Sequence, residues 1–125
     1  MKTRIAPPSM DFPVPLSPGI IANGFLFVSG LGPHDPVTGE KPDGIRDQTR
    51  ATLANLQLVL AEAGLDLSDV VRVSAHLQEV ERDFAAYNQA YAELMPEPHP
   101  ARKTVGSDLI MGMLVEIDMV AAVRE

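Results

Sequence analysis

An Asn-Gly dipeptide between two short apolar runs constrains the fold of this chain more than any other feature. The runs are residues 19–22 and 25–28, and Asn23-Gly24 lies between them. Asn-Gly between apolar runs is the strongest short-range signal for a tight β-hairpin, because both turn positions need a positive φ angle. The sequence therefore predicts two antiparallel strands joined at this dipeptide.

Two later stretches carry apolar residues at helical spacing. The first runs from residue 45 to 63, with Asp43 as a candidate cap and Gly64 as a candidate stop. The second runs from about 81 to 95 and ends before Pro96. Both stretches are predicted to be amphipathic helices.

Further strands are predicted at residues 70–77, 103–106 and 113–120, whereas the proline-rich arm 7–18 is expected to be edge strand or loop. The element order is then β-β-α-β-α-β-β. Connections this short imply right-handed crossovers onto one sheet, with both helices covering one face of it.

The second face of that sheet also carries apolar side chains. Phe25 and Phe27 point to one side of their strand, and Leu26 and Val28 point to the other. The sequence holds no third layer to cover the second face, so something outside the chain must do so. Self-association is the economical answer.

Length and charge limit the classes of function. At 125 residues the chain is expected to form one domain, residues 1–125. Its 10 Lys and Arg against 17 Asp and Glu give a net charge of −7, which argues against a broad nucleic-acid surface. The absence of cysteine excludes disulfides, thiolate catalysis and zinc-thiolate sites.

Neither a membrane segment nor a metal site is expected. No stretch approaches the roughly 20 apolar residues that cross a bilayer, and the N-terminus lacks an apolar core of signal-peptide length. We therefore expect a soluble, cytoplasmic protein. His34, His76 and His99 are far apart and show no metal-ligand spacing.

An arginine and a glutamate near the end of the chain are the main candidates for chemistry. Arg102 follows a Pro-Ala step at the entry to a predicted strand, and Glu116 interrupts an apolar run fourteen positions later. Arginine binds a carboxylate through two N–H donors at once, and a glutamate is costly to bury unless it is used. The pair suits a site for a small acid. Alternatively, Arg102 is an exposed ion-pair partner and Glu116 points to water.

Four further residues accompany this pair. Ser29-Gly30, at a strand end, exposes backbone N–H groups and allows a ligand to approach closely. Asn88 lies on the apolar side of the second helix and needs partners there, either at the site or in a loop backbone. Asp118 projects from the same strand face as Glu116, so the two could act as acid and base, or one could be paired and the other solvated.

Short motifs along the chain carry a family resemblance. Together they resemble the RidA family (also called YjgF/YER057c/UK114), the reactive enamine/imine deaminases, from about residue 17 to 122. The motifs occur in order at residues 16–19, 28–30, 33–40, 48–49 with 55–56, 63–64, 69–71, at Phe84, Asn88 and Tyr91, and at 100–102 and 115–117.

The resemblance implies a two-layer α+β fold with a mixed sheet, like that of a bacterial chorismate mutase. It also implies a homotrimer in which the sheets form a barrel, the helices lie outside and three sites lie in clefts between subunits. In such proteins the matching arginine grips the substrate carboxylate and the matching glutamate positions water, roles that fall to Arg102 and Glu116. Ser29, Gly30 and Asn88 match positions that line or support the cleft.

The implied reaction is hydrolytic deamination of 2-aminoacrylate-like enamine or imine acids to 2-keto acids and ammonia, without a cofactor. Leu16 stands where family members of the best-studied type often have tyrosine, so a hydroxyl contact is missing. This favours an alternative, a pathway-specific enzyme acting on another unsaturated amino or keto acid. A non-catalytic trimer that binds small acids is a further alternative. RNA cleavage has also been attached to the family, and the net charge of −7 argues against it here. Whether Asp118 or Thr104 reaches the cleft is left open.

Overall fold

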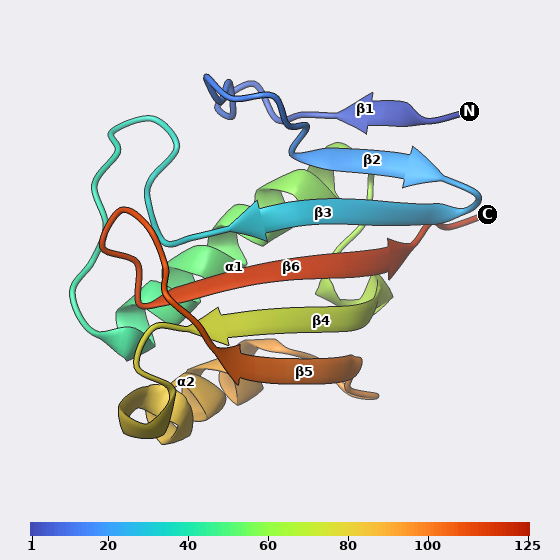
Figure 1. Ribbon diagram of the computed structural model, residues 1–125. Helices are drawn as coiled ribbons and strands as arrows, with labels where there is room; N and C mark the ends of the chain where they lie inside the picture. The colour runs from blue at the N-terminus through green and yellow to red at the C-terminus, as the bar shows by residue number, and fades with distance from the viewer.

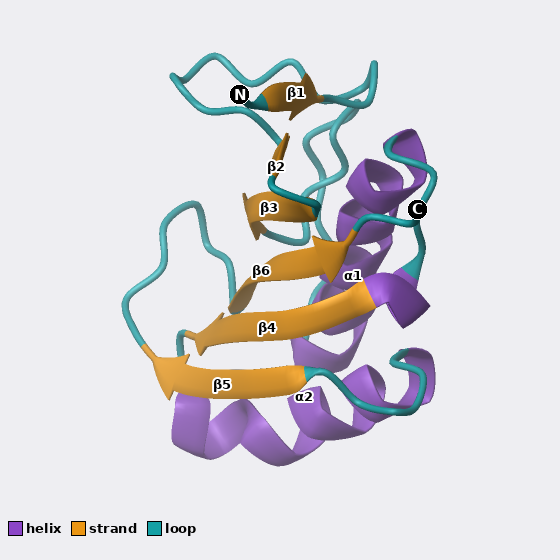
Figure 2. Cartoon of the chain, turned by 90° about the vertical axis from the view of Figure 1, so that its right-hand side faces the viewer, coloured by secondary structure: helices purple, strands orange, loops and turns teal.

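The chain folds into one six-stranded sheet with two helices on one face. The computed structural model describes residues 1–125, and its strands lie in the order β1-β2-β3-β6-β4-β5 (Figure 1). Both helices lie on the same side of the sheet (Figure 2). The elements are β1 (Thr3–Ile5), β2 (Gly19–Ala22), β3 (Phe25–Leu31), α1 (Ile45–Glu62), a 3-10 turn (Leu67–Asp69), β4 (Val70–Leu77), α2 (Val80–Leu94), β5 (Ala101–Gly106) and β6 (Val115–Ala122).

The predicted two-layer α+β fold is confirmed, and the sheet is mixed. Strands β4 and β5 pair in parallel, and every other neighbouring pair is antiparallel. The last strand, β6, inserts between β3 and β4, so the chain ends in the middle of the sheet (Figure 1). The strand predicted at residues 103–106 is β5, which begins two residues earlier. The strand predicted at residues 113–120 is β6, which begins and ends two residues later.

The hairpin turn has the predicted geometry. Asn23 and Gly24 have φ angles of 52° and 82°, and Ala22 pairs with Phe25 across the turn. Strand β1 was not predicted, because three residues carry no periodic pattern. Between β1 and β2 the proline-rich arm is loop rather than strand.

The first helix begins differently from the prediction. Its N-cap is Gly44 with a φ of 82°, and no side chain caps the helix, so the assignment of Asp43 as the cap is wrong. Gly64, with a φ of 73°, lies just after the helix as expected for a stop. Neither helix is long and apolar enough to cross a membrane.

The core lies between the sheet and the helices. Leu26 and Val28 of β3 are buried there together with Leu53 and Leu56 of α1. The opposite face of the sheet has no covering layer within the chain (Figure 2), and Phe27 on that face is 47% exposed. The predicted uncovered second face is therefore present.

Candidate active site

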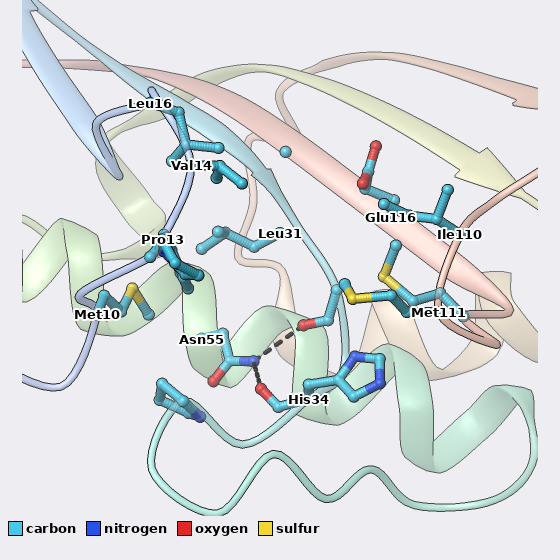
Figure 3. Close-up of a pocket in the computed structure, with 15 residues that line it drawn as sticks. Met10, Pro13, Val14, Leu16, Leu31, His34, Asn55, Ile110, Met111 and Glu116 are labelled. Atoms are coloured by element: carbon cyan, nitrogen blue, oxygen red, sulfur yellow. Dashed lines mark hydrogen bonds between the residues drawn. The ribbon is translucent and has the colours of Figure 1, made fainter.

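An apolar pocket of about 410 Å³ lies beside the end of β3 and the start of β6. The proline-rich arm forms one wall, with Val14 and Leu16, and the β5–β6 loop forms the other, with Ile110 and Met111 (Figure 3). Glu116 lies on the loop side of the pocket (Figure 3). The remaining lining residues are Met10, Phe12, Pro13, Gly30, Leu31, Gly32, His34, Pro36, Asn55 and Met113.

The alternation of β6 sets the direction of Glu116. Val115 and Ile117 are fully buried under the helices, so Glu116 between them projects from the open face of the sheet. A Cβ atom on Gly30 would lie 3.2 Å from both Cδ and Oε1 of Glu116. The bare backbone at Gly30 thus leaves room for the carboxylate.

Hydrogen bonds hold the pocket walls in place. The Ser29 hydroxyl donates to the Ser17 carbonyl at 2.6 Å, and the Ser29 N–H donates to the Pro18 carbonyl at 2.9 Å. These bonds tie the end of β3 to the arm. The Asn55 side-chain amide, from α1, donates to the carbonyls of Gly32 and His34, each at 2.9 Å (Figure 3). Asn55 is part of the family motif at residues 55–56, but no role at the site was predicted for it, because a polar residue inside a helix carries no signal of its partner.

Arg102 faces the helices. In the parallel register it pairs with Val73, which is fully buried under the helical layer. Its guanidinium carbon lies 4.7 Å from the centroid of the Tyr91 ring and 5.6 Å from that of the Tyr87 ring, both on α2. Thr104, two positions along β5, faces the same way, and its hydroxyl lies 3.5 Å from the Tyr87 hydroxyl.

Within one chain the predicted site residues form two groups. Glu116, Gly30 and Leu16 line the apolar pocket, and Ser29 adjoins it. Arg102 lies across β4 from β6 and projects from the other face of the sheet. Asn88, on α2, does not line the pocket either.

Charged side chains gather near Glu116 on the open face. Burial raises the pKa of Asp118, while His76, Arg72 and Lys103 oppose that rise by their positive charge. The His76 ring nitrogen Nδ1 lies 3.0 Å from the Ser107 hydroxyl. Asp118 shares the face of Glu116, as predicted, but does not line the pocket. The net effect is a pKa of Asp118 above its ordinary value, with burial as the largest cause.

No group of three or more His, Cys, Asp or Glu side chains is arranged to hold a metal ion. The two charged candidates are also free of ion pairs, since none of the salt bridges in the chain involves Arg102 or Glu116. A partly buried charge without an oppositely charged partner is available to a charged or polar ligand.

Comparison with known proteins identifies the family. Residues 9–123 match the family described as Endoribonuclease L-PSP. The chain belongs to this family, the YjgF/RidA family. The match to the family covers nearly the whole chain.

Relatives agree with this assignment. A RutC family protein of Pyrococcus horikoshii is 44% identical over 109 residues, which are 86% of this chain and 86% of that protein. The chloroplastic Reactive Intermediate Deaminase A of Arabidopsis thaliana is 33% identical over 123 residues, 97% of this chain and 64% of that protein. A Rid-family crystal structure from Yersinia pestis superposes with a TM-score of 0.91 at 32% identity, covering 98% of this chain and 100% of that one. The resemblance to the RidA family is confirmed.

Proposed function

We propose that this RidA-family protein hydrolyses 2-enamine and 2-imine acids, of the 2-aminoacrylate type, to 2-keto acids and ammonia. The observation that carries the proposal is the pair of unpaired charged groups, the Arg102 guanidinium and the Glu116 carboxylate. The first suits a substrate carboxylate and the second suits a water molecule. The name of the Arabidopsis relative, Reactive Intermediate Deaminase A, supports the same reaction class.

We further propose that the site forms between two copies of the chain in a homotrimer. Arg102 and Glu116 project from opposite faces of the sheet, so one chain does not bring them together. The exposed Phe25 and Phe27 give the uncovered face an apolar surface that a second copy would bury. Arg102 of one copy would then complete the pocket that holds Glu116 of another.

In the proposed reaction Arg102 binds the substrate carboxylate with two N–H donors and fixes C2 of the imine. Glu116 accepts a proton from water while the water oxygen forms a bond to C2. The C=N electron pair moves to nitrogen, and Glu116 returns its proton to that nitrogen, which gives a carbinolamine. Glu116 then carries the hydroxyl proton of the carbinolamine to the same nitrogen; as the C–N bond breaks, ammonia leaves and the C=O double bond of the 2-keto acid forms. Imines hydrolyse unaided, so orientation and one proton-transfer group suffice.

The first test is ammonia and keto-acid release in a coupled assay, in which a pyridoxal-phosphate dehydratase generates fresh enamine from serine or threonine. Charge-assisted hydrogen bonds contribute about 1.5–3 kcal/mol each, so Arg102→Ala should lose about tenfold or much more in kcat/KM. Glu116→Gln should also lose activity. Arg46→Ala and Glu62→Gln are matched controls at exposed positions of α1 and should keep the wild-type rate. Near-wild-type turnover by Arg102→Ala would refute the carboxylate-binding role.

Mixing two inactive variants tests whether the site is shared. Arg102→Ala and Glu116→Ala subunits, unfolded and refolded together in equal amounts, would place an intact arginine beside an intact glutamate in about a quarter of the sites. Activity should therefore recover to about a quarter of the wild-type value. No recovery, in mixtures that light scattering shows to be assembled, would contradict a site between copies.

A second candidate function is deamination of a bulkier, more apolar substrate. The pocket supports it, since Leu16, Val14, Ile110 and Met111 give it apolar walls and its 410 Å³ exceeds what a three-carbon acid fills. The same assay with amino-acid oxidases that release imines of leucine or methionine separates the two candidates. A larger kcat/KM for the larger imines favours the second, and binding of keto acids without any turnover would indicate a small-acid-binding protein.

RNA cleavage, which the family description names, is not proposed for this chain. Its net charge of −7 opposes broad contact with a polyanion. We expect any RNA binding to be weak and to disappear at modest salt concentration. Specific cleavage that persists at physiological salt would contradict this expectation.

A further inference from the structure

We infer that Tyr87 and Tyr91 of α2, here called the tyrosine pair, are positioning residues that hold the Arg102 guanidinium ready for a carboxylate. The inference rests on the proposed function, in which Arg102 binds the substrate carboxylate. It adds two residues that act in the same site through Arg102.

The geometry places the guanidinium over both rings. Its carbon lies 4.7 Å from the Tyr91 ring centroid and 5.6 Å from the Tyr87 ring centroid. The two rings are 5.9 Å apart and tilted by 42°. Because a cation within about 6 Å of a ring centroid is attracted to the negative face of the ring, each distance is short enough for attraction. Tyr87 is 0% exposed and Tyr91 is 5% exposed, so water weakens that attraction little.

Sequence spacing and strand register bring these groups together. Tyr87 and Tyr91 are the only tyrosines of the chain and lie four positions apart on α2, so they share one face of the helix. Arg102 is on the edge strand β5, on the side of the sheet that α2 covers. The sheet edge and the helix face together fix the position of the guanidinium.

What distinguishes Arg102 is the kind of partner that holds it. Arg50, Arg82 and Arg124 each form a salt bridge with an aspartate or glutamate. An acidic partner occupies the N–H donors and would compete with a substrate carboxylate. Aromatic rings attract the guanidinium through its flat face and leave the N–H groups at its edge free. Arg102 is thus held beside the two rings, and no acidic side chain competes for its N–H donors.

The Tyr91 hydroxyl separates the role of the ring from that of its polar group. This oxygen is buried and has no hydrogen-bond partner, and burial raises the pKa of Tyr91 to about 12. The phenol therefore stays neutral and leaves a polar group unsatisfied, which is unfavourable. Phenylalanine would keep the ring and remove that unfavourable group. Tyr91→Phe and Tyr91→Leu accordingly test the ring alone.

Holding Arg102 before the ligand arrives should act on binding more than on the chemical step. A long side chain that is already ordered does not have to be ordered when the ligand binds. Loss of the ring should therefore weaken binding of carboxylates and raise KM, with a smaller effect on kcat.

The test is calorimetric titration of the assembled protein with a 2-keto acid, 2-oxobutanoate, together with the coupled deaminase assay. Tyr91→Leu should raise the Kd for 2-oxobutanoate and the KM about threefold to tenfold. Its kcat should change less than about twofold. Tyr91→Phe, which keeps the ring, should bind 2-oxobutanoate as tightly as wild type. Phe84→Leu is the matched control, because the centroid of this ring on the same helix lies 6.2 Å from that of Tyr87, whereas the cation–π contacts of Arg102 are with Tyr87 and Tyr91.

A double-mutant cycle separates positioning from general packing. In an Arg102→Ala background, Tyr91→Leu should cause no further loss of binding, because the group that the ring positions is gone. Should Tyr91→Leu fail to fold, pentafluorophenylalanine at position 91 keeps nearly the same shape and reverses the sign of the ring quadrupole. That substitution should weaken binding as the leucine variant does.

Three results would overturn the inference: unchanged binding by a ring-deficient variant that is folded, an equal loss in the Arg102→Ala background, or no binding of 2-oxobutanoate by wild type. Wild type that binds the keto acid through Arg102 and Tyr91 but does not accelerate deamination would refute the proposed function alone. If wild type is an active deaminase and a folded Tyr91→Leu variant has the wild-type KM and Kd, the positioning role of the tyrosine pair alone would be refuted.

Discussion

Adding one methyl group at Gly30 is expected to displace the Glu116 carboxylate while leaving the fold intact. The new Cβ would lie 3.2 Å from Cδ and Oε1 of Glu116. Ordinary contacts between carbon atoms are about 3.5–4.0 Å, so the carboxylate would have to move by about half an ångström. Glu116 ends in a flexible side chain, which can make this shift without moving the backbone.

The magnitude follows from the size of that shift. A misplacement of 1 Å at a reacting group can cost about 10²-fold in rate, so half that displacement predicts a loss of about tenfold in kcat/KM for Gly30→Ala. Stability should change little, because alanine restricts the unfolded chain by about 0.4–1 kcal/mol and the local crowding offsets this. We expect the melting temperature to stay within about 4 °C of wild type.

The coupled dehydratase assay and thermal unfolding by circular dichroism measure the two quantities separately. In a Glu116→Ala background, Gly30→Ala should cause no further loss, since the displaced group is absent. An unchanged rate in the single variant would show that the position of Glu116 does not matter to the reaction. An equal loss in both backgrounds would show that the methyl group acts on something else, such as the substrate, and would equally refute the reasoning.

Three further perturbations have defined outcomes. Gln48→Leu should lower the free energy of unfolding by about 2–4 kcal/mol in chemical denaturation, because the 2% exposed Gln48 side chain satisfies the Pro42 carbonyl and the Leu114 N–H; a loss no larger than that of the exposed control Gln57→Leu would contradict this. Burial raises the pKa of Asp118 above 3.8, so its folded form holds the proton more tightly. Its contribution to stability should therefore rise as the pH falls through the raised pKa, and Asp118→Asn should remove that increment, which denaturation at several pH values can detect. Leu16→Tyr should lower kcat/KM for leucine-derived imines relative to kcat/KM for 2-aminoacrylate. An unchanged ratio of the two values would show that Leu16 does not contribute to substrate specificity.

Local signals predicted most of the secondary structure. The turn at Asn23-Gly24 needed two positive φ angles, which these residue types adopt easily, and the structure has them. Apolar spacing located both helices to within about two residues, as expected for a periodic pattern. The assignment of Asp43 as a cap failed because Gly44, with its positive φ, occupies that place instead.

The candidate site was predictable only as separate pieces. Strand alternation correctly put Glu116 and Asp118 on one face, because that property depends on nearest neighbours in the chain. It could not show that Gly30 lies against Glu116, since this contact depends on the pairing of β3 with β6. The hydrogen bonds from Asn55, a residue of the 55–56 motif, to the Gly32 and His34 carbonyls were not predicted for the same reason.

The sequence by itself determined every helix and strand except β1, their order, the family and the residue types available for chemistry, because these depend on local periodicity, turn geometry and ordered motifs. Only the tertiary structure decided which groups from different strands and helices lie together. It inserted β6 between β3 and β4, put Glu116 in an apolar pocket and turned Arg102 towards the tyrosines of α2. Strand order and register arise from long-range burial of the core, which no short stretch of sequence encodes.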